Sequence, residues 1–209
     1  WHVPFLALAL LGLLGGVVLA TQLKPVADHL KEPQRHSAFV HLFQTLREPR
    51  YLMAFATTAL LTTGGFMLMP FSSADTVSNL GLRLHDLPTV YLITGACTIF
   101  FGPMIGKGAD RFGRFKVYMF GTALAIVMVL IYTHLGKIAL PLLVVVNVFM
   151  FMGIFARMIP FQVLASTLPI PSQRGSFNAI SASVQQLSGG VAAVIAGHIV
   201  SVGADGRLL

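Results

Sequence analysis

Long apolar segments separated by short polar stretches are the strongest constraint on the fold of this chain. A helix needs about 20 mostly apolar residues to cross the hydrocarbon core of a bilayer. Only 10% of the residues are charged and 56% are hydrophobic, whereas soluble domains carry about 25% charged residues. So few charges cannot cover a water-facing surface, and we therefore expect an all-α membrane protein. Six segments are apolar enough to span the bilayer, namely residues 3–23, 51–73, 88–106, 117–135, 139–159 and 177–202.

Basic residues between these segments set the expected orientation. Lys and Arg concentrate in the cytoplasmic loops of membrane proteins. They are dense after the first span, between the third and fourth, and around the connection of the fifth to the sixth, whereas the other side offers only Arg83, Lys137 and Arg207. The basic loops are therefore predicted to be cytoplasmic, with both chain ends outside. This distribution also accounts for the net charge of +7, so we expect no nucleic-acid partner.

The sequence lacks the motifs of catalytic and metal chemistry. Cys97 is the single cysteine and lies inside an apolar span, so it can form no internal disulfide. There is no zinc-type cluster of Cys and His, no phosphate-binding Walker loop and no Gly-x-Ser-x-Gly nucleophile motif. We expect neither an enzyme nor a bound metal or cofactor.

A short charged turn separates the third and fourth spans. Gly106 and Gly108 are expected to permit close backbone approach and positive φ at the end of the preceding helix. Asp110 can face the positive end of a helix N-terminus, and Arg111 and Arg114 can reach carbonyls or carboxylates at neighbouring helix ends. Such a cluster would hold one gate state together. The alternative is that these charges only anchor the turn at the membrane surface.

Two spans carry ionisable candidates for function. Arg157 lies in the fifth span, where a charge costs at least ~2.5 kcal/mol at membrane depth. It is predicted to face a water-filled cavity or a carboxylate, or else to snorkel to the interface, and Pro160 is expected to break the helix nearby. Asp75 follows the outer end of the second span and either carries a proton or serves as an exposed acid or helix cap. Asn79 is a candidate polar contact beside it.

Polar side chains at helical spacing mark a possible cavity lining. Thr62 follows Thr58 in the second span, although threonine hydroxyls often bond back to the preceding turn. Gln185 belongs to a polar stripe in the first half of the sixth span, with Asn178, Ser181 and Ser188. Small residues beside this stripe are expected to let helices pack closely; they are Gly189, Ala193 and Gly197.

Residues 24–49 form a connector too polar and too long for a tight turn. Apolar Phe39, Val40, Leu42, Phe43 and Leu46 alternate at helical spacing with His41, Gln44 and Arg47, and this spacing suits a helix on the membrane surface. The alternative is an ordinary solvated linker with a helical end.

The charged turn resembles the cytoplasmic loop signature of the major facilitator superfamily, Gly-x-x-x-Asp-Arg-x-Gly-Arg. Its matched positions are Gly106, Asp110, Arg111, Gly113 and Arg114. Residues 155–160, 174–177 and 183–187 are similar to the tenth and eleventh helices of bacterial proton-driven drug and arabinose-type exporters. One departure concerns Arg114, because residues 168–173 lack the carboxylate with which the family's loop arginine commonly pairs.

The resemblance implies six helices forming roughly half of a twelve-helix fold. Residues 1–23 would be the last helix of the N-terminal half, 24–49 the cytoplasmic connector between the halves, and 50–209 a C-terminal half lacking its last helix. The missing N-terminal helices would then be a structural partner, together with the lipid bilayer. The expected location is the cell (inner) membrane, crossed several times.

These expectations favour a secondary active transporter, with proton-coupled efflux of a drug-like molecule or sugar by alternating access. Protons are the expected coupling ion. A facilitator or importer of an organic anion or sugar, anchored by Arg157, is the second hypothesis. A non-transporting, truncated membrane subunit is the third.

Overall fold

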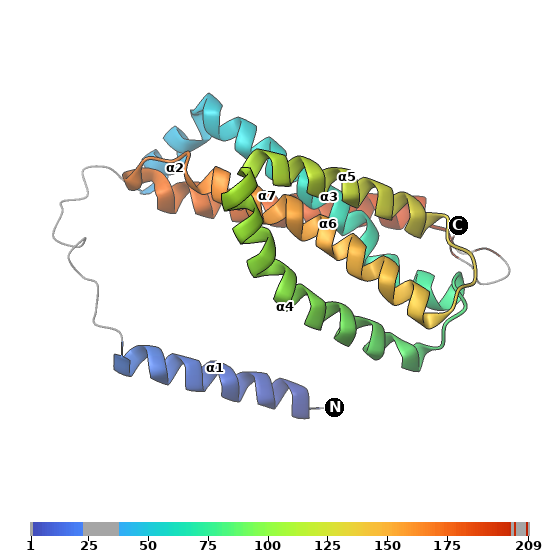
Figure 1. The fold of residues 1–209 in the computed structure, drawn as a ribbon. Coiled ribbons are helices and arrows are strands. Elements are labelled where there is room, and N and C mark those ends of the chain that lie inside the picture. The colour runs from blue at the N-terminus through green and yellow to red at the C-terminus, as the bar shows by residue number, and fades with distance from the viewer. Residues whose placement is uncertain (1, 23–37, 202, 204–207, 209) are drawn as a thin grey trace. The chain divides into compact units, whose positions relative to one another are not determined.

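The computed structural model describes residues 2–22, 38–201, 203 and 208, which fall into two units divided between Ser37 and Ala38. Helices make up the regular structure of both (Figure 1). The first unit contributes α1 (Val3–Gln22), a helix with no charged residue. The second unit contains all the other helices. Each unit is described by itself.

Five helices of the second unit are long and apolar enough to cross a membrane, and with α1 the described residues contain six such helices. The predicted all-α class and the number of spans are therefore confirmed. Helices suit this role because every backbone polar group in hydrocarbon must be satisfied within the segment. Their bounds are α3 (Pro49–Ser78), α4 (Leu87–Phe112), α5 (Arg114–Thr133), α6 (Leu140–Ser166) and α7 (Arg174–Ile199).

Three helices end beyond the predicted ends of their spans. α3 ends at Ser78 rather than at residue 73, so Asp75 lies within the helix and not after it. α4 continues to Phe112 rather than ending at residue 106, so most of the predicted loop is helical. α6 passes through Pro160, where a break was expected, and ends at Ser166. The predicted spans ended where the apolar run ended or where a proline followed. A helix can, however, continue into the polar interface, and membrane helices tolerate proline.

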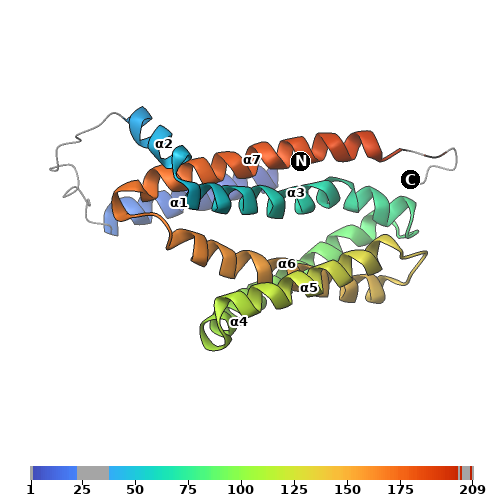
Figure 2. The same ribbon diagram turned by 90° about the horizontal axis from the view of Figure 1, so that it is seen from above.

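The helices of the second unit pack in two groups. α3 lies alongside α7, and α4, α5 and α6 pack against one another, as Figure 2 shows. Two short 3-10 turns, η2 (Leu84–Asp86) and η3 (Pro171–Gln173), precede α4 and α7. Because successive helices run in opposite directions, α3, α5 and α7 begin at the end of the bundle where α4 and α6 finish. We call this the basic end, because most of the described Lys and Arg residues lie there, and we call the other end the opposite end.

α5 and α6 approach each other most closely through two glycines. A Cβ added to Gly121 would lie 2.5 Å from the backbone carbon of Ala156, and one added to Gly153 would lie 2.7 Å from the backbone nitrogen of Ala125. Small residues at such a crossing bring the backbones into van der Waals contact, which drives helix association in a bilayer. The predicted close packing on the last span holds more loosely, since a Cβ added to Gly189 would lie 3.0 Å from the ring of Phe66, a side chain rather than a backbone.

Two buried clusters lie at opposite ends of this bundle. One is near the ends of α3 and α5, and its members are Leu80, Leu82, Val90, Met128, Tyr132, Leu143, Val146 and Met150. The other is at the basic end, and its members are Tyr51, Ala54, Phe55, Ala165, Phe177 and Ile180. Large apolar side chains remain exposed along every span, as expected where lipid or further helices cover the surface.

A short helix, α2 (Ala38–Arg47), packs against α7 and α3 at the basic end. It confirms that the second part of the predicted connector is helical. Residues 24–37 of that connector lie outside the described residues.

Candidate functional site

A cleft of about 440 Å³ lies between α3, α6 and α7, toward the basic end. It combines threonine, serine, asparagine and glutamine side chains with aromatic rings, and none of its described lining residues is charged. Its polar members are Thr58, Thr62, Gln162, Ser166, Asn178, Ser181 and Gln185, and its larger apolar members are Leu61, Met158, Phe161, Val163 and Phe177. We call it the α3–α6–α7 cleft.

Thr62 and Gln185, both predicted from helical spacing, line this cleft. Thr58 lies beside them, but its hydroxyl donates to the carbonyl of Ala54 at 2.9 Å, as threonines in helices often do. A wall of neutral amides and hydroxyls beside aromatic faces can bind a molecule that has both hydrogen-bonding groups and apolar surface.

An aromatic cluster borders the cleft at the basic end and joins α3 to α7. The rings of Phe55 and Phe177 stack with centroids 5.0 Å apart, and Tyr51 meets Phe177 edge-on at 5.3 Å. The Tyr51 hydroxyl also donates to Gln173 Oε1 at 2.9 Å. Sequence patterns predict none of these contacts, because Tyr51 and Gln173 are 122 residues apart in the chain.

Arg157 lies on α6 beside Met158 but does not line the α3–α6–α7 cleft. Its Nε is buried and has no hydrogen-bond partner among the described residues. The Nη2 atom lies 3.9 Å from the point where a Cβ on Gly64 would stand, so the guanidinium lies beside Gly64 of α3 at an ordinary van der Waals distance. The Arg157 guanidinium therefore lies between membrane-spanning helices, and its Nε forms no hydrogen bond with the described residues.

A second cleft, of about 250 Å³, lies at the opposite end and contains Asp75 and Asn79. Asn79 Nδ2 donates to Asp75 Oδ1 at 2.8 Å and to the carbonyl of Leu208 at 2.9 Å, while the Leu208 amide donates back to Asn79 Oδ1 at 3.0 Å. Asn79 therefore recognises a backbone segment and orients Asp75 at the same time. The Tyr132 hydroxyl shares this cleft and donates to the carbonyl of Ser72 at 3.3 Å.

The predicted candidates do not converge on one site. Thr62 and Gln185 line one cleft, Asp75 and Asn79 line the other, and Arg157 lines neither. α3 is the helix common to both clefts, since it carries Thr62 in its first half and Asp75 near its end.

The charged motif forms a near-continuous helical joint rather than a loop. Only Gly113 separates α4 from α5, with φ +97° and ψ 132°. Gly106 and Gly108 are helical, and neither has positive φ. The expectation of positive φ at these two glycines is therefore wrong, because the turn occurs later, where α4 actually ends.

Two charged side chains of this motif form an ion pair, and a third lies near a ring. Arg114 Nη2 lies 4.0 Å from Asp110 Oδ1, and their side chains are 39% and 75% exposed. The Arg111 guanidinium lies 5.5 Å from the ring of its neighbour Phe112. Among the described residues no ion pair joins the motif to another helix end. An exposed pair of this kind contributes little to stability.

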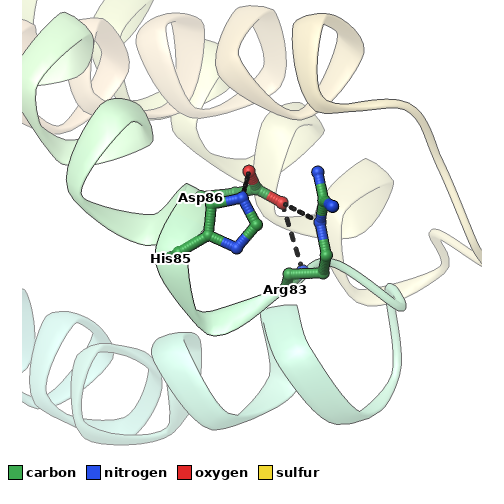
Figure 3. A network of polar contacts seen from close by, with 3 residues as sticks. All are labelled: Arg83, His85 and Asp86. Carbon is green, nitrogen blue, oxygen red and sulfur yellow. Dashed lines mark hydrogen bonds and ion pairs between the residues drawn. The ribbon is translucent and has the colours of Figure 1, made fainter.

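A polar cluster that the sequence analysis did not single out precedes α4 at the opposite end (Figure 3). Asp86 Oδ2 accepts from the backbone amide of Arg83 at 3.3 Å and from its Nε at 3.4 Å, while His85 Nε2 lies 3.1 Å from Asp86 Oδ1. This cluster shapes the turn before Leu87, and the sequence signal for it is an acid placed immediately before the Leu-Pro start of a helix.

Comparison with known proteins identifies the family. The family model described as Major Facilitator Superfamily matches residues 1–193. No curated protein and no solved structure matches the chain. The six apolar helices are consistent with half of a major facilitator fold, and members of this family are transporters rather than enzymes. The chain therefore belongs to the major facilitator superfamily, a family of multi-pass membrane transporters.

Proposed function

We propose that this chain serves in proton-coupled efflux of a small molecule by alternating access, as in the drug and arabinose-type exporters. The observation that carries this proposal is the α3–α6–α7 cleft, whose neutral polar and aromatic lining suits a drug-like molecule or a sugar. In this proposal α1 is the last helix of the N-terminal half, residues 24–49 connect the halves, and residues 50–209 form the C-terminal half. The transporter resides in the inner cell membrane, and the two halves rock around a central site.

The cleft can be tested by changing the hydrogen-bonding capacity of its wall. Gln185→Leu keeps most of the side-chain volume and removes an amide from the lining. We expect the KM for export of a labelled substrate by the full-length protein to rise by about tenfold or more, because a hydrogen-bonding substrate group would face apolar surface. Gln186→Leu is the matched control, because this neighbouring side chain is exposed and lies outside the cleft. Equal KM values for both variants would count against the cleft.

Proton coupling is assigned to Asp75, whose carboxylate lies in a cleft and is oriented by Asn79. Alternating access requires a group whose protonation changes the relative free energies of the two states. Asp75→Asn should reduce transport driven by a proton gradient and leave exchange without a gradient largely intact, in proteoliposomes containing a labelled amphipathic cation or sugar. Asp86→Asn is the control, since that acid lies in the surface turn before α4. Equal export with and without the gradient in the unaltered protein would reject proton coupling.

A second candidate function is facilitated transport or import of an organic anion or sugar. The Nε of Arg157, buried and without a hydrogen-bond partner in the part of the chain that the structure describes, favours it, because a guanidinium fork binds carboxylate or phosphate bidentately. Under this hypothesis Arg157→Lys keeps the charge but loses the fork, and Arg157→Ala loses both. Selective loss of anionic substrates in both variants, most severe in the alanine variant, would support an anion anchor over neutral export.

A further inference from the structure

The helix α2 has one face packed on the bundle and another left open. Thr45 is fully buried, and Leu42 packs against the cluster of Tyr51 and Phe177. This face fixes α2 against α3 and α7 at the basic end of the bundle. The helix is therefore held at the basic end, where α3, α5 and α7 begin and α4 and α6 finish, and ends of bilayer-spanning helices are expected at the level of the lipid head groups.

The open face joins apolar surface to a positive charge. Phe43 is 56% exposed and Leu46 is 44% exposed. The guanidinium carbon of Arg47 lies 4.4 Å from the centroid of the Phe43 ring, which is cation–π geometry. The Phe43 ring can enter the boundary between head groups and acyl chains, and the Arg47 guanidinium lies on it. This pair is complementary to a lipid with an apolar tail and an anionic head group.

The surrounding charge is complementary to the same partner. Arg50 follows on the first turn of α3 and is exposed. The other described cations at this end are Lys107, Arg111, Arg114, Lys116 and Arg174, whereas the described acids here are Glu48 and Asp110. Each basic residue close to an anionic leaflet strengthens the attraction of its segment to that leaflet about fivefold.

From these observations we propose that the open face of α2, formed by Phe43, Leu46 and Arg47, is a binding surface for anionic phospholipid at the basic end of the bundle. Phe43 and Leu46 enter the region between head groups and acyl chains. Arg47, supported by Arg50, binds the phosphate. The proposal rests on the six membrane spans and not on the direction or the substrate of transport.

The test places a fluorescent reporter on this face. Phe43→Trp is made in the protein with Trp1, the single tryptophan of this sequence, replaced by Phe. The protein is reconstituted into vesicles that contain brominated phosphatidylglycerol or brominated phosphatidylcholine at the same mole fraction. We expect both lipids to quench the tryptophan, and the anionic lipid to quench it about fivefold more effectively at low lipid fraction.

Charge variants then distinguish binding from simple exposure. Arg47→Gln should remove most of the preference for phosphatidylglycerol, Arg47→Lys should retain much of it, and added salt should weaken it. Leu130→Trp, on an exposed stretch of α5 near the opposite end, is the control and should be quenched equally by the two lipids. An unquenched tryptophan at position 43 would show that protein covers this face. Equal quenching by the two lipids there would show no headgroup selectivity, and either result overturns the proposal.

Discussion

Gly113 has the backbone conformation that most clearly requires glycine. Its φ of +97° with ψ of 132° lies in a region that is almost closed to residues with a Cβ. This conformation lets α4 end at Phe112 and α5 begin at Arg114 with a single residue between them. Asp110 and Arg114, on the two sides of this joint, lie within ion-pair distance.

We expect Gly113→Ala to destabilise this joint by about 1–3 kcal/mol, because alanine must be strained or the helices must reorient. The measurement is the thermal unfolding midpoint in detergent, followed together with transport. Gly108→Ala is the control from the same motif: it is helical, and nothing lies within 4 Å of the added methyl group. The control should keep or slightly raise the midpoint. Equal losses in both variants would contradict the backbone explanation.

At the scale of elements, the contact between α5 and α6 depends on Gly121 and Gly153, which belong to no sequence motif. Gly121→Ala would place its Cβ 2.6 Å from the Arg157 backbone nitrogen, which no side-chain rotation can relieve. The two helices would have to separate, at a cost of about 1–3 kcal/mol. A lower unfolding midpoint is expected, while Gly95→Ala, which meets open space on α4, should leave it unchanged. An unaltered midpoint for Gly121→Ala would exclude this close contact.

The junction of α3 with α7 supports a second prediction at this scale. Tyr51→Phe removes the hydrogen bond to Gln173 but keeps the ring against Phe177. A partly buried hydrogen bond of this kind contributes about 0.5–1.5 kcal/mol. A double-mutant cycle with Gln173→Ala should give a coupling free energy of that size, measured by chemical unfolding in detergent. A coupling near zero would show that Tyr51 acts only through its ring.

The sequence predicted those elements whose cause is local. Hydropathy located all six spans, and helical spacing placed Thr62 and Gln185 on faces that line one cleft. The ends of α3 and α4 were missed, because a helix can outlast its apolar run. The Gly121 contact and the Tyr51–Gln173 bond were also missed, because both depend on which helices become neighbours, and helical spacing within one segment carries no such information.

At the scale of the whole molecule, the second unit carries a cleft toward each of its two ends. The α3–α6–α7 cleft is neutral and lies toward the basic end, whereas the cleft of Asp75 and Asn79 lies at the opposite end. α3 lines both, so a tilt of this helix would alter the two clefts together. This arrangement suits a transporter that opens to one side at a time. If the basic end faces the cytoplasm, the neutral cleft is the one nearer the cytoplasm.

That orientation can be measured directly by cysteine labelling in intact cells. Cys97 is first replaced by serine, and single cysteines are introduced as Lys116→Cys near the start of α5 or Lys137→Cys between α5 and α6. Because basic loops remain on the cytoplasmic side, an impermeant maleimide should label position 137 from outside and position 116 only after permeabilisation. Arg83→Cys, in another exposed turn at the same end as Lys137, should behave like Lys137→Cys. Labelling of position 116 in intact cells would show that the chain has the opposite orientation in the membrane. It would then place the neutral cleft nearer the outside and the Asp75 cleft nearer the cytoplasm.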